Sequence, residues 1–349
     1  MKITREQAIA GSLKDKGNYI AGLFIPHRNQ TLVTNTIADT LLNPVAGLSI
    51  ILLVGPPGVG KTTMGKILLQ KLLDSFAIEI QEDPSIIPAF MSEVDAPDKD
   101  EVNFVLLYCR MCHDLLAPSP MDGLNIVNEL KEPLEQLRSS RVMFERALWA
   151  RKVKNLILDE VLHFTNTNTD PAQYGNLLKS LSNRARFNLL LLGAYGSENL
   201  IEATGQLARR IVVVHYPRYK ETREDFRAYC AAVKSFAEAL PVRCKVDVKN
   251  CMGYLFKGTF GLLGQTFDIL KESIKPCIAD GERQWRDEYI LRSMPSLKAQ
   301  LKIAKETVRG EMTIMPFLQG NVMHAYLNES QVRAELELEA ERARTRRAW

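Results

Sequence analysis

Two kinds of segment alternate along the first two thirds of the chain. Short, almost wholly apolar runs are typical of strands buried on both faces of a sheet. Five such runs are present, at 50–54, 102–109, 155–159, 189–192 and 211–215. Between several of them, apolar residues recur every three or four positions, as in amphipathic helices. This alternation predicts an α/β fold with a five-stranded parallel, doubly wound sheet, whose ligand would lie at the carboxyl ends of the strands.

The segments between these runs differ in polarity. Helical spacing of apolar residues occurs at 31–42, 126–137 and 142–149. Residues 80–101 are acidic and contain prolines, which predicts a surface insertion. Residues 110–123 contain two prolines and a glycine, which predicts a long loop.

The pattern changes after Pro217. Residues 220–310 show helical periodicity and no convincing strand, with predicted helices at 226–240, 262–278 and 289–308. The tail from Ser330 is first acidic and then basic, which suits an exposed terminal helix, while a docking peptide or a basic contact with DNA stays an alternative. The predicted parts are an N-terminal segment 1–44, an α/β domain 45–218, a helical domain 219–310 and a C-terminal tail 311–349.

The most specific motif follows the first apolar run. Residues 55–62 spell G-x-x-x-x-G-K-T between a predicted strand and a predicted helix, the context that a phosphate-binding loop requires. Its backbone N–H groups would hold phosphates, Lys61 would add a charge, and the Thr62 hydroxyl would ligate Mg²⁺. The predicted nucleotide-binding residues are Gly55, Pro56, Pro57, Gly58, Val59, Gly60, Lys61, Thr62 and Thr63.

Two further stretches bear on this site. The run 155–159 ends in Asp159 and is followed by Glu160, the Walker B pattern. Asp159 would hold Mg²⁺, and Glu160 would orient or deprotonate the attacking water. Residues 24–28 favour a surface strand, although their position ahead of the phosphate loop leaves open a second interpretation, a cover over the adenine ring.

Composition narrows the class of protein. With 46% hydrophobic and 25% charged residues, the chain is ordinary for a soluble globular protein. The net charge of +4 permits a nucleic-acid partner without arguing for one. No apolar run reaches the length of a membrane span or a signal peptide, so we expect a cytoplasmic protein with reduced cysteines and no membrane partner.

Cys109, Cys112 and His113 spell C-x-x-C-H, a pattern found at haem attachment, redox and zinc sites. The motif closes an apolar run, and Cys244 and Cys251 have unsuitable spacing for a second pair of zinc ligands. We interpret the motif as coincidence.

The motifs together resemble a known class. A phosphate loop, a Walker B strand and a helical domain after the fifth strand follow the order of the AAA+ ATPases. The stretches 177–183, 189–193 and 206–210 resemble the TnsC/TniB family, the ATPases that regulate Tn-seven-like transposons, some of them CRISPR-associated. Residues 261–270 resemble the lid helix of that family.

The resemblance implies roles for further residues. Arg210, with Arg209 beside it, matches the arginine finger that reaches the γ-phosphate of a neighbouring subunit, so that Lys61, Glu160 and these arginines form the catalytic set. Two positions depart from the family. Ala194 and then Tyr195 stand where a threonine or asparagine follows the sensor strand, and Gln265 stands where the lid arginine contacts the nucleotide. The missing sensors predict slow hydrolysis.

The implied function is ATP-dependent regulation of transposition. Such a protein, with ATP and Mg²⁺ as cofactors, would assemble into a ring or filament, a hexamer or heptamer, on target duplex DNA. It would link a target-selection protein of the TniQ type to the transposase, without cutting DNA itself. The candidate DNA contacts are Arg110, His113, Lys152 and Lys154.

Two other functions share the same core. A helicase loader or replication-initiation ATPase would be favoured by a helix-turn-helix after the lid, which residues 281–349 do not clearly show. A signalling NTPase switch that acts without DNA would be favoured by large sensor repeats, which the sequence lacks.

Overall fold

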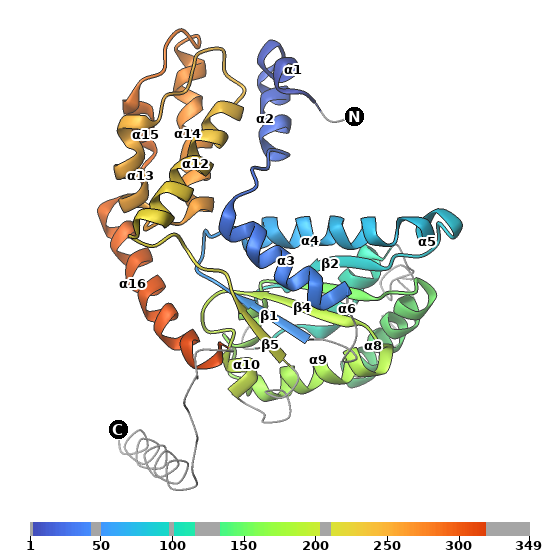
Figure 1. Ribbon diagram of the computed structural model, residues 1–349. Helices are drawn as coiled ribbons and strands as arrows, with labels where there is room; N and C mark the ends of the chain where they lie inside the picture. The colour runs from blue at the N-terminus through green and yellow to red at the C-terminus, as the bar shows by residue number, and fades with distance from the viewer. Residues whose placement is uncertain (1–2, 43–49, 98–100, 116–132, 203–210, 319–349) are drawn as a thin grey trace, which may run out of the picture. The chain divides into compact units, whose positions relative to one another are not determined.

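The computed structural model describes residues 3–42, 50–97, 101–115, 133–202 and 211–318 (Figure 1). A five-stranded sheet lies at its centre, in the order β2-β3-β4-β1-β5, and every neighbouring pair is parallel. The strands are β1 (Ile50–Val54), β2 (Ala89–Glu93), β3 (Asn155–Asp159), β4 (Asn188–Gly193) and β5 (Ile211–His215). All residues of β1 and β3 are buried, as expected for strands covered on both faces.

Helices cover both faces of the sheet (Figure 1). On one face, α3 (Arg28–Leu42) and α4 (Lys61–Ser75) pack on alternate residues of the central strands, such as Ile51, Leu53 and Leu190. On the other face lie α8 (Pro133–Ala150) and α9 (Pro171–Ala185). The shorter elements are α5 (Ala77–Glu82), the 3-10 turn η1 (Val161–Phe164) and α10 (Asn199–Glu202). The predicted fold class is therefore confirmed.

The predicted strand at 102–109 is wrong. These residues enter α6 (Phe104–Asp114), which begins where the side chain of Asn103 accepts a hydrogen bond from the N–H of Leu106. An apolar run of this length does not distinguish a strand from a buried helix. The residues buried on α6 are Leu107, Tyr108, Cys109, Met111 and Cys112.

The missing strand lies in the stretch predicted to be a surface insertion. Residues 89–93 form β2, which pairs with β3 at one edge of the sheet. An edge strand needs fewer apolar residues than a central one, so its signal is weak among the acidic residues and prolines of 80–101. The surface strand predicted at 24–28 is also wrong: residues 23–27 form an irregular connection, and α3 begins at Arg28.

Helical segments follow β5. The five helices described there are α12 (Arg223–Ala239), α13 (Met252–Gly258), α14 (Leu263–Ala279), α15 (Asp287–Ser293) and α16 (Leu297–Ile314), with 3-10 turns η2 (Lys249–Cys251) and η3 (Met315–Phe317). The sequence predicted a single helix at 289–308, whereas Pro295 separates α15 from α16. Their core includes Tyr229, Val233, Phe236, Leu255, Leu270 and Ile274.

The N-terminal helices pack against this helical part. They are α1 (Arg5–Ala10) and α2 (Leu13–Ala21). The Arg5 guanidinium donates to the Leu240 carbonyl at 3.1 Å, and the Lys16 ammonium forms a buried ion pair with Glu282 at 3.0 Å. Residues 1–317 form one compact unit, and the predicted domain boundary at 218 stays a prediction. None of the described helices combines the length and apolarity needed to cross a bilayer.

Candidate nucleotide site

The phosphate loop lies between β1 and α4, at the carboxyl end of the sheet. Gly60 has φ +106°, a conformation that side-chain-bearing residues rarely adopt. Gly55 is required for a different reason, since a Cβ there would lie 2.7 Å from the Tyr216 carbonyl oxygen. Gly60 caps α4 without a side-chain hydrogen bond. The N–H groups at the start of this 15-residue helix are therefore available to an anion.

Lys61 occupies the position of a phosphate-binding lysine. Its ammonium donates to the carbonyl oxygens of Gly55, at 2.9 Å, and Pro56, at 3.1 Å. Burial lowers the pKa of Lys61 to about 8, although the nearby carboxylates of Glu160 and Asp159 favour the charged form. A polyphosphate would strengthen that second effect.

The Walker B carboxylates lie where β3 ends. Asp159 is buried, and one of its oxygens accepts the N–H of Glu160 at 2.8 Å. Glu160 has φ +57°, which turns the chain sharply out of the strand. Thr62 is exposed in the first turn of α4. The hydroxyl of Thr62 and the carboxylate of Asp159 are the hard oxygen donors that Mg²⁺ prefers, so these residues fit the predicted metal role.

Among the described residues, no cluster of three or more acidic, histidine or cysteine side chains could hold a metal. Mg²⁺ in nucleotide sites is commonly held by one or two protein ligands together with substrate phosphates. The C-x-x-C-H motif lies on α6, where Cys109 and Cys112 are buried in helix packing and His113 is exposed.

The residues after β4 make structural contacts. The Tyr195 hydroxyl lies 2.9 Å from Nε2 of His215, and burial raises the pKa of Tyr195. A Cβ on Gly310 of α16 would lie only 2.1 Å from the Tyr195 ring. Tyr195 thus packs between β5 and α16, and Ala194 brings no polar side chain to the site.

The start of α14 contacts the phosphate loop. The Gln265 N–H donates to the Gly58 carbonyl at 2.9 Å, and a Cβ on Gly264 would lie 2.5 Å from that same oxygen. The Gln265 side-chain oxygen is buried without a hydrogen-bond partner. The predicted lid residue therefore lies at the loop, with an unpaired acceptor that a bound ligand could satisfy.

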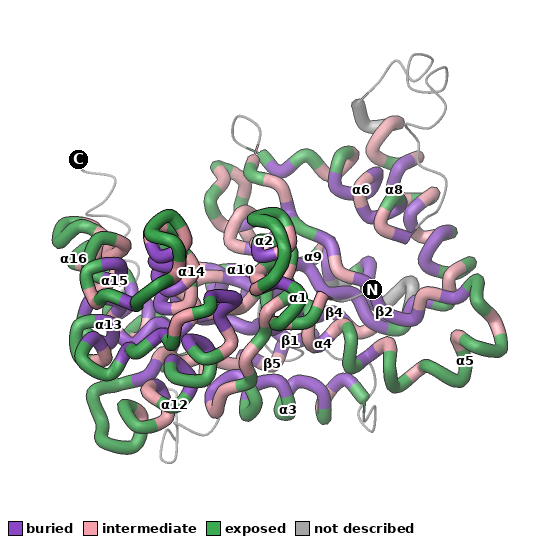
Figure 2. The backbone as a smooth tube through the Cα atoms, turned by 90° about the horizontal axis from the view of Figure 1, so that it is seen from above, coloured by how far each residue is buried: buried purple, intermediate pink, exposed green. Residues whose placement is uncertain are grey.

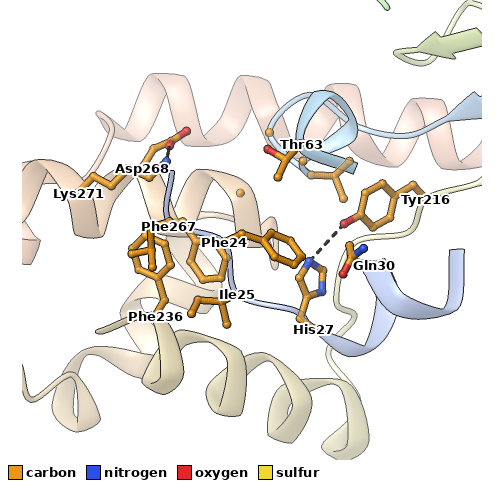
Figure 3. A pocket seen from close by; sticks show the side chains of 15 residues that line it. Phe24, Ile25, His27, Gln30, Thr63, Tyr216, Phe236, Phe267, Asp268 and Lys271 are labelled. Carbon is orange, nitrogen blue, oxygen red and sulfur yellow. Dashed lines mark hydrogen bonds and ion pairs between the residues drawn. The ribbon is translucent and has the colours of Figure 1, made fainter. Parts of the chain in front are cut away.

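A cavity of about 160 Å³ opens beside the loop (Figure 3). Its lining joins regions distant in sequence: the connection before α3 and the start of α3, the phosphate loop and the start of α4, the residue after β5, α12 and α14. Its aromatic and apolar residues include Phe24, Ile25, Val59, Tyr216, Phe236 and Phe267. The presence of Phe24, Ile25 and His27 in this lining fits the second interpretation of residues 24–28, a cover over the adenine ring, which stays a prediction. Sequence reasoning missed Tyr216 and Phe267, because no motif contains them.

The remaining predicted residues do not gather at one place. Arg209 and Arg210 lie outside the described residues. Arg110 and His113 belong to α6 rather than to a loop, and Arg110 pairs with Asp95, beyond the carboxyl end of β2. Lys152 and Lys154 precede β3 at the opposite end of the sheet, and Lys152 pairs with Asp83. These four candidates form no common basic patch.

Comparisons with known proteins agree with this geometry. Residues 46–201, from the segment before β1 to α10, match the family model described as an AAA domain. No curated protein matches the sequence. Among solved structures, the S. cerevisiae Hsp104–ADP complex is similar at 15% identity and a TM-score of 0.50, over 86% of this chain and 47% of that one.

Two further structures have the same kind of similarity. A Walker-type ATPase of Pyrococcus abyssi is 14% identical, with a TM-score of 0.49, over 91% of this chain and 92% of that chain. Cdc6p of Pyrobaculum aerophilum is 16% identical, with a TM-score of 0.48, over 75% of this chain and 66% of that chain.

The fold is that of the AAA+ P-loop ATPases: a five-stranded parallel sheet, a phosphate loop after its first strand, and a helical C-terminal part. Residues 46–201, which match the AAA domain model, contain the phosphate loop and the Walker B strand. Outside this range, Gln265 of α14 contacts the phosphate loop.

Proposed function

We propose that this protein is an ATP-dependent regulator of transposition of the TnsC/TniB type. The observation that carries the proposal is the hydrogen bond between the Gln265 N–H and the Gly58 carbonyl, because it joins the helical part directly to the phosphate loop. A nucleotide bound in that loop would then control how the helical part is held. The sequence resemblance at 177–183 and 189–193 supports a transposition regulator among proteins with this fold.

In this proposal, different residues bind the phosphates, act on the attacking water and hold the metal. The loop N–H groups and the Lys61 ammonium bind the phosphates, and Glu160 orients or deprotonates the attacking water. Mg²⁺, held by Thr62 and Asp159, would neutralise charge on the phosphates. Gln265 supplies no positive charge where the resembling family has an arginine, and this favours slow hydrolysis.

A slow ATPase suits a timing switch. Arg210 would complete the site of a neighbouring subunit, so hydrolysis would require assembly. The assembly would form on duplex DNA, connect a TniQ-type protein with the transposase, and release its partners after hydrolysis.

Duplex-DNA binding tests this proposal. Glu160→Gln should still bind ATP but hydrolyse it about 10²-fold more slowly, because the water loses its base, and its DNA complexes should last longer. The measurements are phosphate release and fluorescence anisotropy of a labelled duplex, with Lys61→Ala as the variant that binds neither ATP nor DNA. DNA binding that is unaffected by ATP would contradict the proposal.

A further inference from the structure

A chain of polar side chains leads to the cavity and ends in the contact between His27 and Tyr216, which both line it (Figure 3). The His27 ring lies between two tyrosines: its Nδ1 is 3.0 Å from the Tyr219 hydroxyl, and its Nε2 is 3.2 Å from the Tyr216 hydroxyl. The N–H of Asn29 also reaches the Tyr219 hydroxyl, at 3.3 Å. Tyr216 and Tyr219 are almost completely buried.

The direction of these hydrogen bonds follows from what each group can do. A backbone N–H only donates, so the Tyr219 oxygen accepts from Asn29. If His27 donated to Tyr219 as well, the Tyr219 hydrogen would have no acceptor among its described neighbours. With the other tautomer, it is the Tyr216 hydrogen that lacks an acceptor within this group. Tyr216 lines the cavity, where a ligand can accept its hydrogen, whereas Tyr219 does not line it. Tyr219 therefore donates to Nδ1 of His27.

The rest of the chain is then determined. A neutral imidazole carries one N–H, which must be on Nε2, and it donates to the Tyr216 oxygen. Burial lowers the pKa of His27 to about 4, so the ring is neutral at physiological pH. The Tyr216 oxygen therefore accepts from His27, and the Tyr216 hydroxyl hydrogen has no acceptor on that ring.

The Tyr216 hydroxyl lies beside the phosphate loop, 3.8 Å from where a Cβ on Gly60 would stand, and it lines the cavity. The cavity wall is mixed: Phe24, Ile25 and Val59 are aromatic or apolar, whereas Asp268 and Lys271 are charged. We propose that Tyr216 is a specificity-determining residue that donates a hydrogen bond to a ring nitrogen of the nucleotide base. This inference rests on the proposed binding of ATP.

The surroundings of the Tyr216 hydroxyl favour a contact with the base rather than with the ribose or the phosphates. The phosphates have the loop N–H groups and Lys61, whereas the cavity offers flat aromatic surfaces of the kind that stack on bases. Burial also raises the pKa of Tyr216, which keeps the phenol protonated as a donor. A base presenting a carbon at this point would leave the Tyr216 hydrogen unpaired.

The proposed contact is tested by removing the Tyr216 hydroxyl from the protein and, separately, one ring nitrogen from the base. Affinities of ATP and of its 1-deaza, 3-deaza and 7-deaza analogues are measured for the wild-type protein and for Tyr216→Phe, which keeps the ring. We expect one analogue to bind the wild type about tenfold more weakly than ATP does, and Tyr216→Phe to bind that analogue and ATP equally. Tyr254→Phe, on an exposed tyrosine of α13, is the matched control and should behave as the wild type.

Other outcomes of this experiment would contradict either the inference about Tyr216 or the proposed function, and the two cases can be told apart. If Tyr216→Phe weakens ATP binding while every analogue loses the same factor in both proteins, the hydroxyl contacts ribose or phosphate and the inference is wrong. Unchanged ATP affinity in Tyr216→Phe also overturns it. If the wild-type protein binds no ATP at all, the proposed function itself fails.

Discussion

At the scale of single residues, Lys61 has the most informative electrostatics. Its pKa of about 8 means that the ammonium of the free protein loses its proton over the range in which most proteins are assayed. Polyphosphate binding needs the charged form, so ATP binding should take up a proton above pH 8. We expect ATP affinity to fall about tenfold between pH 7 and pH 9.

Titration of a fluorescent ATP analogue at several pH values measures this effect. Lys61→Arg is the matched variant, because a guanidinium stays charged throughout and should abolish the pH dependence whatever the absolute affinity. If the ATP affinity of both proteins depended equally on pH, the proton taken up on ATP binding would belong to a group other than Lys61.

The sequence located the residues of the site that belong to motifs. Gly55 to Thr63 and Asp159–Glu160 could be found because the chemistry demands those residue types at fixed spacing. Tyr216 and His27 could not be found in this way. They meet only because the connection before α3 crosses the end of β5, and no local pattern records a contact over 189 positions.

At the scale of elements, the contact between α14 and the phosphate loop is the feature to test. Gly264→Ala would place a Cβ 2.5 Å from the Gly58 carbonyl and 3.3 Å from the Gly60 nitrogen. Because both neighbours are backbone, the start of α14 must shift and the bond from the Gln265 N–H weakens. We expect about a fivefold loss of ATP affinity, equivalent to about 1 kcal/mol.

Gly253→Ala is the control for this substitution. It lies on α13 with nothing within 4 Å of the added Cβ, so it should leave ATP binding intact and stabilise the helix by up to about 1 kcal/mol. If Gly264→Ala bound ATP as tightly as Gly253→Ala, the contact would have no part in nucleotide binding.

Elements were predicted well where the spacing of apolar residues was unambiguous. The central strands and α3, α12 and α14 lie close to where the pattern placed them. The failures have a common cause. The run at 102–109 is apolar except for Asn103, so period alone does not separate helix from strand. β2 lies at the sheet edge among acidic residues and prolines, so its apolar signal is weak. In both segments tertiary contacts decide between helix, strand and loop, and a local pattern does not contain those contacts.

At the scale of the whole molecule, the N-terminal helices are joined to the helical part by a buried ion pair (the colouring by burial is shown in Figure 2). Lys16 and Glu282 are both less than 10% exposed, and Lys16 also donates to the Pro241 carbonyl. Lys16→Met should lower the free energy of unfolding by about 3 kcal/mol, because Glu282 is left as an uncompensated buried charge.

Urea denaturation measures this loss. The double variant Lys16→Met/Glu282→Gln should recover part of it, and Lys275→Met, from an exposed pair with Glu272, should change stability little. Equal stability of the single and double variants would show that the buried charge is not the cause.

Electron microscopy would show whether the protein assembles on DNA under the control of ATP. The full chain would be imaged with a slowly hydrolysed ATP analogue, with and without duplex DNA, beside Lys61→Ala. We predict rings or helical filaments threaded by DNA in the wild-type sample, with a countable number of subunits, and none in Lys61→Ala. Monomers, or oligomers that form equally without DNA, would contradict ATP-dependent assembly on DNA and favour a signalling switch that acts without DNA.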